Sequence, residues 1–230
     1  MSLRERRKQQ TRKLLTDTAT ELFLAKGFDA VRVVEIAEAC GVSEKTVYNY
    51  FPTKEALLLD HVEALPDALR SALGDHATPP VTAVLAVLAD ELGALIGRIA
   101  AAPDFDRARE QTRHFGELIR STPSLRAYQH EETARLTTMT AELLAPRFGG
   151  DSAALAAAHA LLGLWAVQYA SLRRHLETAS GPEELRAAIT TDVRRAADVI
   201  ERGLSSEPWQ STSPGSTRAP GTTGPPGSAT

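Results

Sequence analysis

Apolar residues recur at three- and four-residue intervals along most of the chain, which is the period of an amphipathic α-helix. In residues 9–26 this period forms one apolar stripe, and Gly27 follows where a helix would end. No stretch shows the strict apolar–polar alternation of a half-buried strand. The pattern therefore predicts an all-α protein.

Three shorter helices are predicted after the first. One face of the next helix carries four apolar or small residues, Val33, Ile36, Ala37 and Cys40. Gly41 interrupts this helix, and Ser43 can cap the amides that begin another. Pro52 closes that helix, and Thr53 is expected to cap a fourth helix that continues to about Pro66.

Long helices separated by proline and glycine are predicted from residue 78 onward. The helix over residues 152–179 is apolar on nearly all sides. One of its stripes carries Leu155, Ala158, Leu162, Trp165, Tyr169, Leu172 and Leu176. The other carries Ala157, Ala160, Leu161, Leu164 and Val167. Such a helix must be covered on both sides, within a bundle or by a partner subunit, whereas residues 183–204 show a single stripe typical of an edge helix.

The composition changes at residue 205. Twenty of the 26 residues in 205–230 are Ser, Thr, Pro or Gly. Such a segment buries too little apolar surface to offset the entropy of ordering, so a disordered tail is predicted, with Trp209 as an incidental exposed residue.

Charge is distributed unevenly along the chain. The net charge is −3 overall, but residues 1–54 carry ten Lys and Arg against seven Asp and Glu. This excess is consistent with a nucleic-acid partner for the N-terminal quarter, or with a solvated basic segment. The single cysteine, Cys40, cannot form an internal disulfide, and charged residues interrupt the most apolar stretches. With no signal peptide recognisable, we expect a cytoplasmic protein without a membrane partner.

Residues 32–51 meet the requirements of a helix-turn-helix. Two short helices that cross closely need a small residue at the crossing, a turn residue that tolerates positive φ, and a buried apolar residue on the second helix. Ala37, Gly41 and Val47 supply these in order. The second helix then turns a set of donors and aromatic residues outward, Lys45, Thr46, Tyr48, Asn49 and Tyr50. Such groups suit phosphates and base edges in a major groove, although a plain three-helix bundle can show the same polar face.

Residues 9–58 resemble the DNA-binding domain of the TetR family of bacterial transcriptional regulators. The resemblance rests on LFLAKGFDA and on VVEIAEACGVSEKTVYNYFPTKEALL. It implies a homodimer, a helical C-terminal domain that binds a ligand and dimerises, and repression relieved by a small molecule. The expected organisation is a basic arm over 1–8, the DNA-binding domain over 9–66, and the helical effector and dimerisation domain over 67–204.

The resemblance also assigns roles to individual residues. It places Glu44, Lys45 and Tyr48 nearest base edges. It places Thr46, Asn49, Tyr50 and Lys54 on phosphates. The family usually has Thr at the position of Arg32, so the cap of the following helix is lost, and Arg32 could reach phosphate only as a cation.

No pattern for catalysis or metal binding emerges. The six histidines form no HxxxH or HExxH pair, and neither a GxSxG nor a phosphate-binding glycine loop is present. We therefore expect no enzyme activity, no metal and no cofactor. Four basic residues, Arg107, Arg109, Arg113 and His114, could bind the anionic head of an amphipathic ligand, but a solvated helix face with ion pairs to Glu110 and Glu117 is favoured.

The sequence thus predicts a one-component transcriptional regulator, most simply a repressor released from a pseudo-palindromic DNA operator by a small, largely apolar effector. The alternative is a helical ligand-binding or adaptor protein without DNA activity. The expected effector pocket is lined by Phe105, Phe115, Tyr128, Trp165 and Tyr169. The expected dimer interface consists of Ala157, Ala160, Leu161 and Leu164.

Overall fold

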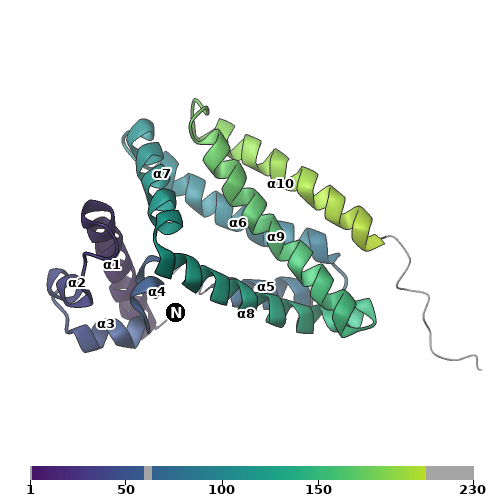
Figure 1. Ribbon diagram of the computed structural model, residues 1–230, viewed down its shortest axis with the longest axis horizontal. Coiled ribbons are helices and arrows are strands. Elements are labelled where there is room, and N and C mark those ends of the chain that lie inside the picture. The colour runs from purple at the N-terminus through teal and green to yellow at the C-terminus, as the bar shows by residue number, and fades with distance from the viewer. Residues whose placement is uncertain (1, 60–63, 206–230) are drawn as a thin grey trace, which may run out of the picture.

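The computed structural model describes residues 2–59 and 64–205, which contain ten helices and no strand (Figure 1). The predicted all-α class is therefore confirmed. The expected tail, including Trp209, lies outside the described residues except for its first position. The helices are α1 (Leu3–Lys26), α2 (Val33–Ala39), α3 (Glu44–Tyr50), α4 (Lys54–Leu58), α5 (Leu65–Gly74), α6 (Pro80–Ala100), α7 (Phe105–Ser121), α8 (Pro123–Phe148), α9 (Asp151–His175) and α10 (Pro182–Ser205).

Helix α1 begins six residues earlier than the apolar pattern predicts. Ser2 and Glu5 form a capping box, in which the Glu5 amide donates to Ser2 Oγ (3.2 Å) and the Ser2 amide donates to Glu5 Oε2 (2.6 Å). These bonds satisfy amides at the start of the helix, so α1 can begin at Leu3. The basic residues expected in an arm over 1–8 therefore lie on the first turns of α1.

Helix α4 is shorter than predicted. Thr53 caps it as expected, accepting a hydrogen bond from the Ala56 amide (3.2 Å), but α4 ends at Leu58. Pro66 does not bend this helix, because it lies in the first turn of α5, where a missing amide hydrogen is tolerated.

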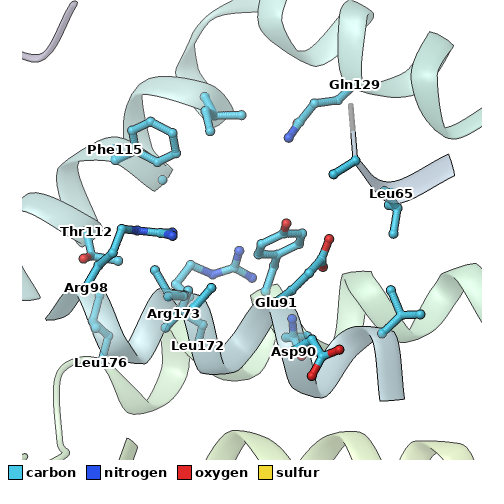
Figure 2. Close-up of a pocket in the computed structure, with 18 of the residues that line it drawn as sticks. Leu65, Asp90, Glu91, Arg98, Thr112, Phe115, Gln129, Leu172, Arg173 and Leu176 are labelled. Atoms are coloured by element: carbon cyan, nitrogen blue, oxygen red, sulfur yellow. The ribbon is translucent and has the colours of Figure 1, made fainter. Parts of the chain in front are cut away.

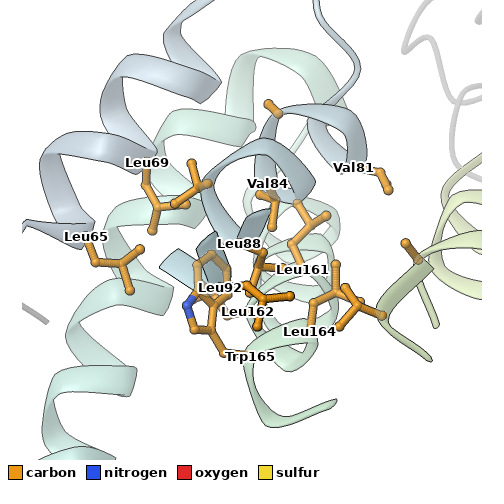
Figure 3. Packing of buried hydrophobic residues seen from close by; sticks show 14 of the residues in the cluster. Leu65, Leu69, Val81, Val84, Leu88, Leu92, Leu161, Leu162, Leu164 and Trp165 are labelled. Carbon is orange, nitrogen blue, oxygen red and sulfur yellow. The ribbon is translucent and has the colours of Figure 1, made fainter. Parts of the chain in front are cut away.

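The helices form two hydrophobic cores. The smaller core joins α1 to α4 around Phe23, Val47 and Phe51, all 0% exposed. The larger core joins α5, α6, α8, α9 and α10 around Leu88, Leu161 and Leu164 (Figure 3).

Residues at the junction of α7 and α8 belong to the smaller core. Ile119 from α7 and Leu125 from α8 pack among residues of α1 to α4, and Leu125 is 0% exposed. Figure 1 shows this junction beside α1 and α4. The long-helix bundle and the N-terminal helices therefore share apolar contacts rather than only a linker.

Helices α6 and α9 are long and apolar enough to cross a membrane by length and composition alone. Both contribute to the larger core, through residues such as Leu88 and Leu161. Contacts with other helices within the subunit therefore account for their apolar composition.

Candidate functional site

The turn between α2 and α3 has the geometry that its residues predict. Gly41 adopts a φ of +67°, in the left-handed region that favours glycine. The Val42 amide donates to the Ala37 carbonyl (3.0 Å), and Ser43 Oγ accepts from the Thr46 amide (3.1 Å). Local chemistry thus ends α2, reverses the chain and starts α3.

Helix α3 packs on the domain by one side only. Val47 is 0% exposed, as predicted, while Tyr48 is 47% exposed despite its aromatic ring. Four residues are exposed, Glu44, Lys45, Tyr48 and Asn49, and two are half-buried, Thr46 and Tyr50. An exposed face with a cation, a phenol and an amide can contact both base edges and phosphates.

Arg12 holds the C-terminal end of α3 to α1, a role that the sequence did not reveal. Its Nη1 donates to the Tyr50 carbonyl (3.1 Å), and its guanidinium carbon lies 4.3 Å from the centroid of the Phe51 ring. The carbonyl is one that the end of α3 leaves without a helical partner. Arg12 therefore positions the exposed face of α3 relative to the rest of the domain.

Lys54 points inward instead of toward the face of α3. Its Nζ donates to the Phe28 carbonyl (2.6 Å) and lies 4.3 Å from the centroid of the Phe28 ring. Burial lowers the pKa of this ammonium. The phosphate contact expected of Lys54 thus does not match this geometry, because the ammonium already stabilises the turn between α1 and α2.

Arg32 is the N-cap residue of α2, but its guanidinium carries no acceptor atom and therefore cannot cap the helix. Instead, Glu35 Oε1 accepts a hydrogen bond from the Arg32 amide (3.0 Å). This bond and a second from Lys26 Nζ (2.9 Å) lower the pKa of Glu35 to about 2. The N-terminus of α2 is therefore capped through Glu35, and the exposed Arg32 side chain stays near it, with 3.5 Å between Nε and Oε1.

A cavity of about 890 Å³ opens among α5, α6, α7, α8 and α9. Its volume lies within the range of about 300–1,000 Å³ typical of small-molecule sites. The walls are largely apolar, with Leu65, Phe115, Leu172 and Leu176 among them (Figure 2). Charged residues from α6, α7 and α9 also face it.

Two of the five predicted pocket residues line this cavity, Phe115 and Tyr169. Phe105 packs against the larger core, and Tyr128 packs against the smaller one. Trp165 is 8% exposed within the larger core. The sequence missed the contribution of α5 and α6, since its apolar pattern shows which residues can be covered and not which space stays empty.

Trp165 does not line the cavity, but it is hydrogen-bonded to Glu91, which does. Its Nε1 donates to Glu91 Oε2 (2.6 Å), and Glu91 lines the cavity. Burial raises the pKa of Glu91 despite this bond. Tyr169 is 42% exposed where it borders the cavity, and burial of its remainder, with the charge of Glu91, raises its pKa to about 12.

The basic cluster on α7 forms the ion pairs that the sequence favoured. Arg113 Nε donates to Glu110 Oε2 (2.9 Å), and Arg113 Nη1 lies 3.5 Å from Glu117 Oε2. Arg109 pairs with Asp106 (2.9 Å). Of this cluster only Arg113 borders the cavity.

Three of the four residues expected at the dimer interface are buried within the subunit. Ala157, Leu161 and Leu164 are 0% exposed, and Ala160 is half-buried. Side chains without exposed surface cannot contact a second copy in this conformation. Helices α8 and α10 pack on α9, so the stripe assigned to a partner is covered by the chain itself.

Comparison with known proteins agrees with this geometry. The model of the bacterial regulatory proteins of the tetR family matches residues 15–60, and the model of the MftR C-terminal domain matches residues 82–205. The chain belongs to the TetR family. The first match covers the helix-turn-helix with the helices that support it, and the second covers α6 to α10.

Relatives in this family include two named transcriptional regulators. The chain is 30% identical over 151 residues to TcmR of Streptomyces glaucescens, covering 65% of each chain and thus just under two thirds of TcmR. It is 30% identical over 166 residues to MftR of Mycobacterium tuberculosis, by name a mycofactocin biosynthesis transcriptional regulator, covering 64% of this chain and 70% of MftR. The SmeT–triclosan complex shares the fold, with a TM-score of 0.54, 19% identity and coverage of 93% of this chain and all of SmeT.

Proposed function

We propose that this protein is a cytoplasmic transcriptional repressor that binds operator DNA through α3 and is released by a small, largely apolar effector in the cavity. The proposal of DNA binding rests on the exposed polar face of α3. Glu44, Lys45 and Tyr48 would contact base edges, and Thr46 and Asn49 would contact phosphates, with Tyr50 at the end of the helix.

The proposal of an effector rests on one observation, which is that α7 contacts both the cavity and the smaller core. Phe115 and Ile119 line the cavity, and both also pack against the smaller core, which supports α3. A compound that fills the cavity would shift α7 and thereby the orientation of the N-terminal helices. The effector would act by stabilising a conformation in which the two α3 helices of a homodimer no longer match successive major grooves.

Footprinting on the DNA upstream of the protein's own gene tests the DNA-binding half. Tyr48→Ala and Lys45→Ala should each weaken specific binding by about 1–3 kcal/mol, because each removes a base contact. Arg70→Ala is a matched control, since Arg70 is exposed on α5 and pairs with Asp67 (2.9 Å). Unchanged binding in both α3 variants would contradict the assignment of α3 as the helix that contacts DNA, and no footprint at all would favour the helical ligand-binding or adaptor alternative.

We also propose a homodimer formed by the outer faces of α9 and α10. Leu155 is 45% exposed and Val199 is 61% exposed, although both are large and apolar. The beginning of α9 and the end of α10 lie at the same end of the bundle (Figure 1). A second copy could cover both, as an isologous contact would.

Two glutamate variants separate a dimer contact from the subunit core. Val199→Glu should yield a folded monomer in sedimentation, because the new charge stays hydrated once the partner leaves. Leu164→Glu should lower the thermal midpoint instead, because it buries a charge inside the subunit. If the Val199→Glu variant and the Leu155→Glu variant both stayed fully dimeric, this interface would be contradicted.

A further inference from the structure

The arginines around the cavity fall into two groups. Arg113 and Arg120, both on α7, lie 3.5 and 3.8 Å from Glu117 Oε2. Arg113 also donates to Glu110 (2.9 Å), so two carboxylates largely balance the two arginine charges within the helix. These two arginines therefore offer little net attraction to a bound compound.

Arg98 on α6 and Arg173 on α9 have no such partner. No carboxylate of residues 2–59 or 64–205 lies within ion-pair distance of either guanidinium, and neither makes a hydrogen bond to the described chain. Figure 2 shows both guanidinium groups extending from their helices into the cavity, that of Arg98 near Thr112 and that of Arg173 between Arg98 and Glu91 in this view. Two unbalanced cations thus face the same space from different helices.

The unpaired carboxylates on α6 lie toward another part of the cavity. Asp90 precedes Arg98 by eight residues, which is about 12 Å along a helix axis. Glu91 accepts the indole hydrogen bond of Trp165. Figure 2 shows Asp90 and Glu91 apart from Arg98. Arg98 therefore lies in a different part of the cavity from Asp90 and Glu91, and Glu117 and Glu177 also line it. The apolar wall includes Leu65, Ala68 and Val87.

Gln168 adds a polar group to the cavity lining. The residue is 5% exposed overall, and its side-chain amide makes no hydrogen bond to the described chain. The amide is available to a polar atom of a compound bound in the cavity.

We infer that the effector is an amphipathic carboxylate, whose head group is bound by Arg98 and Arg173 and whose apolar body lies along α5 and α6. Guanidinium groups suit a carboxylate because they donate paired hydrogen bonds in a planar geometry. Gln168 donates to the same molecule. The inference rests on the proposed effector-responsive function, and it replaces the basic cluster of α7 as the anion site.

Calorimetric titration of the full-length protein with three probes of equal chain length tests this inference. The probes are dodecanoate, dodecan-1-ol and dodecyltrimethylammonium, each below its micelle concentration. Dodecanoate should bind at least about tenfold more tightly than the alcohol, since charge-assisted hydrogen bonds are the stronger ones. The ammonium compound should bind most weakly.

Variants show whether the two arginines cause the preference. Arg98→Gln combined with Arg173→Gln should abolish the preference for dodecanoate and leave dodecan-1-ol binding unchanged. Arg107→Gln is the matched control, because Arg107 is exposed on α7 and does not line the cavity. The control should keep the full preference.

The outcomes separate this inference from the proposed function. Equal affinity for dodecanoate and dodecan-1-ol, tighter binding of the ammonium compound, or a preference that survives the double variant would overturn the carboxylate inference while leaving an effector cavity in place. Binding of none of the probes would overturn both the inference and the effector role of the cavity. A dodecanoate preference in a protein that gives no DNA footprint would support the inference and sink only the DNA-binding half of the proposal.

Discussion

Replacing Arg12 by methionine should loosen α3 without changing any residue of its exposed face. The change keeps a long apolar stem but removes the hydrogen bond to the Tyr50 carbonyl and the cation over the Phe51 ring. A hydrogen bond from a charged donor contributes about 1.5–3 kcal/mol, and a partly exposed cation–π contact about 0.5–1 kcal/mol. We therefore expect a loss of about 2–4 kcal/mol from the free energy of unfolding.

This loss should be visible in both stability and dynamics. If all 230 residues unfold as one unit, a loss of 2 kcal/mol lowers the thermal midpoint by at least about 4 °C, and more if the N-terminal helices unfold first. Hydrogen exchange should accelerate in a peptide covering residues 44–51, because the end of α3 frays. DNA affinity should fall together with this loss of protection.

Lys13→Met is the matched control. It removes the same charge one residue away, from a side chain that is 76% exposed and pairs with Asp17 across one helical turn. Such a pair contributes only about 0.3–0.5 kcal/mol. If Arg12→Met and Lys13→Met showed the same thermal midpoint and the same exchange in residues 44–51, the assigned role of Arg12 would be refuted.

Three further predictions follow from the pairing of charged groups. Lys54→Met should lower the thermal midpoint, because the Phe28 carbonyl loses its donor, while the salt dependence of DNA binding stays unchanged; a flatter salt dependence would restore the phosphate contact. Glu91→Gln should raise the thermal midpoint at pH 7, because burial raises the pKa of Glu91 and the native state disfavours its charge. This gain in thermal midpoint should shrink as the pH falls and the carboxyl becomes protonated in both the native and the unfolded state. A gain that stayed constant with pH would contradict this cause. Asp192→Asn should lower the thermal midpoint at neutral pH, because hydrogen bonds from Ser171 and His175 lower the pKa of Asp192; the difference should fade as acid protonates the native carboxylate, and no difference at pH 7 would argue against a stabilising link between α9 and α10.

The helix-turn-helix could be predicted from the sequence because its determinants are local. Ser43 and Thr53 each cap an amide three residues ahead, and Gly41 reverses the chain by its own φ. The buried side of α3 follows from one residue, Val47, at the spacing that a close crossing requires. Interactions that span three to six residues are encoded in the order of those residues.

The partners of long charged side chains could not be predicted in the same way. Arg12 and Lys54 meet carbonyls 38 and 26 residues away, and no local pattern specifies either contact. Lys54, expected to bind a phosphate, donates to a carbonyl within the chain instead. Arg12, which the sequence showed only as one positive charge among several, positions α3. The many rotamers of these side chains allow several partners, and only the folded chain selects one.

The two apolar stripes of α9 show the same division. Helical periodicity predicted that both stripes are covered, and Leu164 is covered, but by its own subunit rather than by a partner. The cavity likewise needs five helices, and the residues that each helix contributes do not show from their spacing alone that they border an empty space. The sequence by itself determined the helices, their caps and their apolar faces, because backbone hydrogen bonds and side-chain spacing are set within a few residues. Tertiary structure decided which faces meet, which charges stay unpaired and where space remains, because these depend on packing between segments far apart in the chain.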